Sequence, residues 1–157
     1  MKSFKFEFDG GSLKRGFWIY IFEAKLGKKR YFYVGRTGDN STPNAASPFT
    51  RVSRHLDSSP NAQANSFYKR LREIKVAPED CTYRFVSFGP IFPEQSGDFG
   101  EHVPYRDRTA RLERALADWV KEREYDVLGR HPKKGALGTD DKIFEEAKKH
   151  FIRQLGL

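Results

Sequence analysis

The chain has 157 residues, of which 38% are apolar and 32% are charged, and its formal net charge is +8. Fourteen Phe, seven Tyr and two Trp argue against a disordered chain, because these side chains bury large areas. No apolar run reaches the roughly 18 residues of a membrane span, and the N-terminal residues lack the apolar stretch of a signal peptide. The single cysteine, Cys81, excludes an internal disulfide and a zinc site built on paired thiolates. We therefore expect a cytoplasmic protein with no membrane partner.

Alternation and helical periodicity predict three strands and four helices. Aromatic, β-branched and alternating residues indicate the strands, which cover residues 17–23, 30–36 and 81–88. Apolar residues at helical spacing, with Ser66 as one expected N-cap, indicate the helices. The predicted helices cover residues 49–57, 66–75, 107–124 and 140–155.

The segments between these elements have the composition of loops. Residues 24–29 are typical of a hairpin connection, and residues 38–48 and 89–104 are rich in loop-forming residues. The order β-β-α-α-β-α-α predicts one α+β domain over residues 1–157, with helices packed on a small sheet and a helical extension from about residue 140.

The positive charge is spread along the chain, without a long basic tail. A folded surface with excess Lys and Arg attracts polyanions, and nucleic acid is the commonest of these. Plain solubility is the alternative explanation, so charge alone favours a nucleic-acid partner only modestly.

Two strand tyrosines lie on the face opposite the most apolar one. Side chains alternate along a strand, so Tyr20 shares a face with Trp18 and Phe22, and Tyr33 shares a face with Tyr31. The opposite face carries Ile, Phe and Val and is the natural core. The tyrosine face is either covered by helices or forms the floor of a binding site.

The predicted helix over 49–57 places Arg51 and His55 side by side, four residues apart. A guanidinium clamps a phosphate through parallel hydrogen bonds, and an imidazole accepts a proton near neutral pH. A solvated basic face is the alternative interpretation of this pair.

Glu113 lies at the edge of the apolar stripe of the helix predicted over 107–124. A carboxylate there is partly shielded and is aimed inward, as a single metal ligand would be. An ordinary helix glutamate paired with Arg114 or Lys121 is the alternative interpretation.

Taken in order, these residues resemble the motifs of the GIY-YIG endonuclease superfamily. Residues 18–20, Trp-Ile-Tyr, are similar to its first motif, with Trp in the place of the usual Gly. Residues 33–35, Tyr-Val-Gly, are a common variant of its second motif. Arg51 with His55 four residues on, and then the helix residue Glu113, follow in the family's order.

This match spans residues 17 to about 120 and implies a three-stranded antiparallel sheet flanked by helices. It implies hydrolysis of DNA phosphodiester bonds with one Mg²⁺ or Mn²⁺ ion. In that reaction Glu113 would hold the hydrated metal, and Arg51 would stabilise the charge on the phosphorane oxygens. Tyr20 would act on the attacking water with help from His55, and Tyr33 would position the water or the phosphate.

Two further residues are expected to contact substrate phosphate. Arg36 follows the second motif directly, and a surface arginine at a strand end is the alternative interpretation. The late Asn of the family is missing, since no Asn follows Asn65, and His131 is its expected substitute.

The sequence thus predicts a metal-dependent DNA endonuclease, with sequence preference supplied by loops, a homodimer or a partner protein. A non-catalytic nucleic-acid-binding module on the same scaffold is the alternative, and an RNA-binding or structural α+β protein is a third interpretation. The residue set favours the enzyme, because a carboxylate repels DNA unless a metal ion neutralises it.

Overall fold

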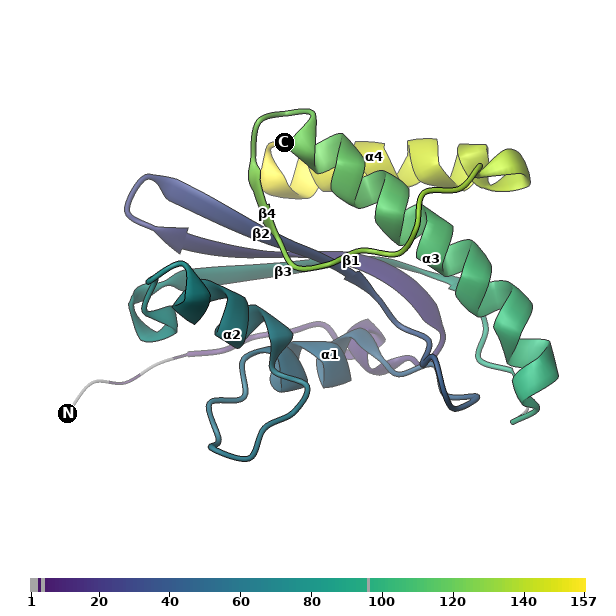
Figure 1. Ribbon diagram of the computed structural model, residues 1–157, viewed down its shortest axis with the longest axis horizontal. Coiled ribbons are helices and arrows are strands. Elements are labelled where there is room, and N and C mark those ends of the chain that lie inside the picture. Colours follow the sequence, from purple (N-terminus) through teal and green to yellow (C-terminus); the bar gives the residue numbers. More distant parts are fainter. Residues whose placement is uncertain (1–2, 4, 96) are drawn as a thin grey trace.

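The structure is a computed structural model that describes residues 3, 5–95 and 97–157, and these residues form four strands and four α-helices (Figure 1). The strands are β1 (Phe17–Leu26), β2 (Lys29–Arg36), β3 (Thr82–Phe92) and β4 (Asp126–Leu128). The helices are α1 (Pro48–His55), α2 (Ser66–Glu73), α3 (Phe99–Lys121) and α4 (Asp141–Leu155). The α+β class expected from the sequence is confirmed.

The sheet differs from the expected one in both size and direction. Its strand order is β3-β1-β2-β4, and β1 pairs antiparallel with both β2 and β3. β4 pairs parallel with β2, so the sheet is mixed and four-stranded, and the prediction of three antiparallel strands is wrong. β4 has only three residues and its partner lies about ninety residues earlier, so no local pattern announces it.

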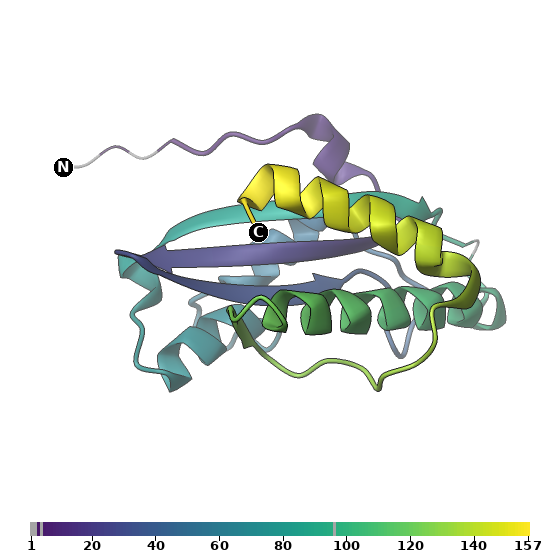
Figure 2. The ribbon, with the colours of Figure 1, turned by 90° about the horizontal axis from the view of Figure 1, so that it is seen from above.

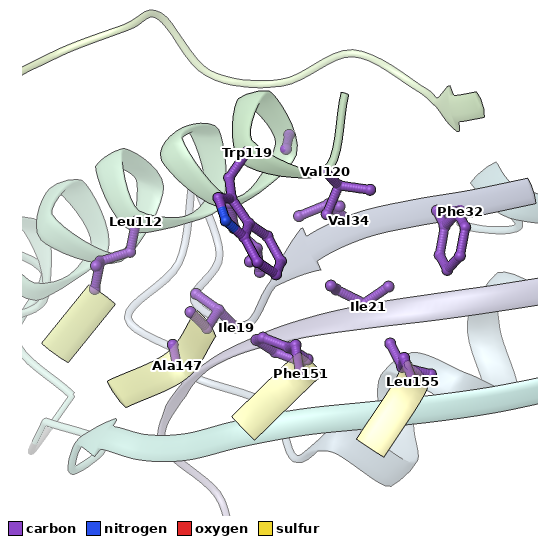
Figure 3. Packing of buried hydrophobic residues seen from close by; sticks show 12 residues of the cluster. Ile19, Ile21, Phe32, Val34, Leu112, Trp119, Val120, Ala147, Phe151 and Leu155 are labelled. Atoms are coloured by element: carbon purple, nitrogen blue, oxygen red, sulfur yellow. The ribbon is translucent and has the colours of Figure 1, made fainter. Parts of the chain in front are cut away.

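Helices cover both faces of the sheet. Figure 1 and Figure 2 show α3 and α4 on one face, while α1 and α2 lie on the other. Figure 3 shows the packing beneath α3 and α4, where the alternate residues Ile19, Ile21, Phe32 and Val34 meet apolar side chains of both helices. This face is therefore the core that the alternation predicted. The contributions of α4 to this core include Ala147, Phe151 and Leu155.

The opposite face holds a second apolar cluster, but only along part of its length. Phe22, Ala24 and Tyr31 of the sheet pack there with Phe67 and Leu71 of α2. Tyr33 lies at the border of this cluster, with its ring 5.6 Å from that of Phe67, and Tyr20 lies beyond it towards the end of β2. This face is thus covered by α2 at one end of the strands and is left as a candidate binding floor at the other end.

The predicted loop over 89–104 is much shorter in the structure. β3 continues to Phe92, and α3 begins at Phe99, so most of the predicted loop over 89–104 is strand and helix. The Asp98 side chain caps α3 by accepting a hydrogen bond from the Gly100 amide. Glycine and proline in this segment, including Pro104 inside α3, caused the incorrect prediction.

Smaller corrections apply at the other boundaries. β1 runs to Leu26 and β2 starts at Lys29, so the connection predicted over 24–29 is a tight turn around Gly27, whose φ is 58°. Ser66 is the first helical residue of α2 instead of its N-cap, because Asn65 occupies that position.

The last turn of α4 is fixed to the sheet by charged side chains. Glu23 is 2% exposed and forms ion pairs with Arg30 and Arg84. Both guanidinium groups also donate to the carbonyl of Leu155, at 2.6 and 3.2 Å. Two cations therefore compensate the buried carboxylate and bind a carbonyl at the negative end of a helix. None of the helices formed by the described residues has the length and apolar character that crossing a bilayer requires.

Candidate active site

A cleft of about 700 Å³ opens where the end of β2 meets α1 and α3. Six of the seven predicted site residues line it: Tyr20, Tyr33, Arg36, Arg51, His55 and Glu113. His131 is not among the lining residues, although its neighbours Arg130 and Pro132 are. Residues from two strands and two helices that are distant in sequence therefore meet in one cavity, whereas His131 does not line it.

Tyr20 and His55 form a hydrogen-bonded pair at the base of the cleft. The Tyr20 hydroxyl lies 2.7 Å from His55 Nε2, and the Tyr20 side chain is only 2% exposed. Burial raises the pKa of Tyr20 well above its ordinary value, and burial together with Arg51 lowers the pKa of His55 to about 4. Both groups are therefore neutral near pH 7, and a neutral imidazole can accept the phenolic proton at Nε2 in the tautomer that carries its own proton on Nδ1.

Gly35 makes room for this pair. It lies in β2 directly opposite Tyr20 of β1, and a Cβ atom at position 35 would overlap the phenol ring. A side chain at this position would displace Tyr20 from His55. Glycine is thus needed at position 35, because the Tyr20 ring occupies the space that a side chain would fill.

Tyr33 also packs against the imidazole of His55. The ring centroids of Tyr33 and His55 are 4.6 Å apart, and the two planes make an angle of 55°. Burial raises the pKa of Tyr33, while a hydrogen bond with Ser66 opposes this shift. His55 thus contacts two phenol rings, one hydrogen-bonded to it and one packed against it, and these contacts restrict the orientation of the imidazole.

Arg51 is held at the mouth of the cleft by Asp39, a residue that the sequence analysis did not single out. Arg51 Nη2 donates to Asp39 Oδ1 at 2.9 Å. The backbone carbonyl of Asp39 is in turn 2.9 Å from Nε2 of His102, a fully buried residue of α3. Among the described residues the buried Arg51 Nε has no hydrogen-bond partner, and the Arg51 side chain lines the cleft.

Glu113 and Arg36 form the buried ion pair of the site. Arg36 Nε lies 3.2 Å from Glu113 Oε2, and the other end of the guanidinium donates to Gly38 O and Asn40 Oδ1. Glu113 is 8% exposed, and burial raises its pKa to about 7, although Arg36 and Arg51 act in the opposite direction. A single arginine therefore does not compensate the cost of burying this carboxylate.

The donor set fits a hydrated hard cation with one protein ligand. The described part of the chain contains no cluster of three or more His, Cys, Asp or Glu side chains able to hold a metal ion. Mg²⁺ needs no such cluster, because it keeps several waters and binds through one or two carboxylates and substrate phosphates. The raised pKa of Glu113 shows a carboxyl group that an additional positive charge would stabilise in its ionised form.

Four further charged residues of the cleft were missed from the sequence: Asp39, Arg106, Asp107 and Arg130. Arg106, Ala110 and Glu113 all line the cleft from α3 and are spaced as one face of a helix. Extending the predicted helix towards residue 99 would have placed Arg106 beside Glu113. Asp39 and Arg130 lie in loops, where no sequence periodicity marks them.

Comparison of the chain with known protein families, with curated proteins and with solved structures found no match. The function is therefore argued from the geometry of the cleft and from the motif resemblance alone.

The neutral imidazole predicts a pH dependence of stability. The pKa of His55 falls from about 6.5 to about 4 on folding, so the native state binds fewer protons between these values. The contribution of His55 to stability is present above pH 6.5 and is lost as the pH falls towards 4, by roughly 2 kcal/mol between pH 7 and 5. Urea unfolding of the wild type and of His55→Gln at both pH values measures it. Equal pH dependence in the two proteins would contradict the assignment.

Glu113 also makes stability depend on pH, so the wild type has to be compared with the His55→Gln variant. Its pKa is raised on folding, so its own contribution is fully present below its unfolded value and is lost as the pH rises towards 7. The two residues act in opposite directions over overlapping pH ranges, and only the difference between wild type and variant isolates His55.

Proposed function

We propose that the protein is a metal-dependent DNA endonuclease of the GIY-YIG type. The observation that carries the proposal is the meeting of two phenols, an imidazole, two guanidinium groups and a buried carboxylate in one cleft. These groups come from β1, β2, α1 and α3, and they match the family motifs in order. Cleavage of a phosphodiester needs a proton acceptor, positive charge around the phosphate and a site for a hard cation, and the cleft contains groups able to supply each of these.

Tyr20 and His55 are proposed to move the proton of the attacking water. A buried neutral phenol is a weak base, so Tyr20 takes the water proton as it passes its own proton to His55 Nε2. The hydrogen bond of 2.7 Å supplies the path for this second transfer. A bound phosphate brings negative charge next to the imidazole and thereby raises the low pKa of His55. Tyr33 keeps the imidazole in place throughout.

The positive side chains are proposed to act on the phosphate. Arg51 lines the cleft and stabilises the charge that grows on the phosphoryl oxygens. Glu113 is the proposed ligand of Mg²⁺ or Mn²⁺, and the ion when bound supplies Lewis-acid stabilisation of the leaving oxygen. Arg36 contacts both Glu113 and the backbone at Gly38, so it holds the carboxylate and the loop after β2 together.

Nicking of supercoiled plasmid tests the proposal. The wild type is incubated with plasmid in Mg²⁺, in Mn²⁺ and in EDTA, and the open-circular and linear products are measured. Nicking that requires the metal ion supports the enzyme. DNA binding without cleavage in either metal would instead support the non-catalytic module, and the absence of DNA binding would reject both.

Substitution of Arg51 is expected to separate the effect on the cleavage rate from the effect on DNA binding. Arg51→Ala is expected to lower kcat by about 10²-fold to 10³-fold, as loss of a donor to a developing charge does, and to weaken DNA binding much less. Single-turnover cleavage and fluorescence anisotropy with a labelled duplex measure the two effects. Arg54→Ala is the matched control, because Arg54 is an exposed arginine of the same helix that does not line the cleft. Equal losses in rate and affinity for Arg51→Ala would contradict the role.

A further inference from the structure

The cleft contains four arginines, and three of them are already neutralised by carboxylates. Arg36 pairs with Glu113, and Arg51 pairs with Asp39. Arg106 pairs with Asp107 at 2.8 Å and also donates to the backbone carbonyl of Asn40. All these groups line the same cavity, so most of its positive charge is compensated in the free protein.

Arg130 is the fourth arginine and differs from the other three. Its side chain is exposed and lines the cleft, and within the described residues it has no hydrogen-bond or ion-pair partner. A phosphate can bind an unpaired guanidinium without first breaking an ion pair. It also gains two parallel hydrogen bonds there, which a partnered arginine cannot offer in full.

The short strand β4 fixes the backbone that carries Arg130. Leu128 of β4 pairs with Tyr33 of β2, and Gly129 follows with a φ of 99°. A Cβ atom at position 129 would lie 3.0 Å from Cε2 of Tyr33, so the backbone passes close over the site tyrosine. Only glycine combines this approach with a positive φ. Arg130 is thus the first residue after a backbone segment that is anchored on the proposed active site.

We infer that Arg130 binds a backbone phosphate of the nucleic acid adjacent to the phosphate held by Arg51. The inference rests on the proposed function for the identity of the ligand, but its test is a binding measurement that does not require cleavage. Arg130 follows β4 and Arg106 lies on α3, and both line the cleft. The nucleic-acid backbone would thus be contacted from two separate elements.

Salt dependence of DNA binding measures this contact. Anisotropy of a labelled duplex is recorded in EDTA from about 50 to 200 mM salt for the wild type, Arg130→Ala and Arg130→Lys. Losing one phosphate contact reduces the slope of log K against log salt by about 0.9, so the loss of affinity across this range becomes roughly 3.5-fold smaller. Arg130→Lys keeps the charge and is expected to keep the slope.

Arg153→Ala is the charge-matched control, since Arg153 is an exposed residue of α4 outside the cleft. An unchanged slope in Arg130→Ala, or the same decrease in Arg153→Ala, would overturn the inference. A wild type that binds no DNA would overturn it together with the proposed function. A slope that depends on Arg130 in a protein that nicks no plasmid would retain the phosphate contact and reject the nuclease.

Discussion

Replacing Glu113 with Gln is expected to lower plasmid cleavage by about 10³-fold, which corresponds to roughly 4 kcal/mol of lost transition-state stabilisation. Gln has the size of Glu but no charge, so it is a poor ligand for a hard cation. DNA binding in EDTA is expected to be kept or strengthened, because a buried negative charge leaves the cleft. The measurements are plasmid nicking in Mg²⁺ and anisotropy in EDTA.

Asp107→Asn is the control for this substitution. Asp107 also lines the cleft from α3, but its carboxylate is half exposed and pairs with Arg106. This substitution also removes one carboxyl group from the lining of the cleft, but it leaves Glu113 in place. Cleavage that survives in Glu113→Gln, or that is lost to the same extent in Asp107→Asn, would show that Glu113 has no special role.

Replacing Tyr20 with Phe is expected to lower the cleavage rate by roughly 10²-fold to 10⁴-fold, the usual contribution of a positioned proton-transfer group. The substitution removes one oxygen atom from a buried ring and leaves the packing intact. His55 Nε2 then loses its partner at 2.7 Å, and the loss of stability is expected to be about 1 kcal/mol. Single-turnover rates and urea unfolding measure the two quantities.

Tyr83→Phe is the control for this substitution, and it is expected to lose a similar amount of stability without losing activity. Its hydroxyl donates to Pro78 O at 2.7 Å, and Tyr83 packs in the cluster beneath α2, outside the cleft. If Tyr20→Phe cleaves as fast as Tyr83→Phe, the proton path through the phenol is wrong, whatever the stability of the two variants.

The central part of the fold was predictable because its signals are local. Ile19 and Ile21 alternate with Tyr20 and Phe22, and this alternation alone assigns the two faces of β1. β4 was not predictable, since three residues pair with a distant strand and carry no pattern of their own. The first two turns of α3 were hidden by Pro104, whose missing amide usually ends a helix but here lies near the N-terminus.

The residues of the candidate site were likewise predictable where they lie in regular elements and not where they lie in loops. Tyr20, Tyr33 and Glu113 lie in regular elements, where periodicity and motif spacing indicate their direction. Asp39 was not predictable, because its role depends on a loop that meets both Arg51 and His102. His131 was placed by analogy with a missing Asn, while β4 carries its neighbour Arg130 to the cleft instead.

The arrangement of the sheet edges bears on self-association. An outer strand with free amides and carbonyls is a template on which a second chain can extend a sheet. At one edge, β4 offers only three residues. At the other, β3 contains Pro90, which has no amide hydrogen to donate. An added strand would therefore find only a three-residue template at β4, and at β3 a template that is interrupted at Pro90.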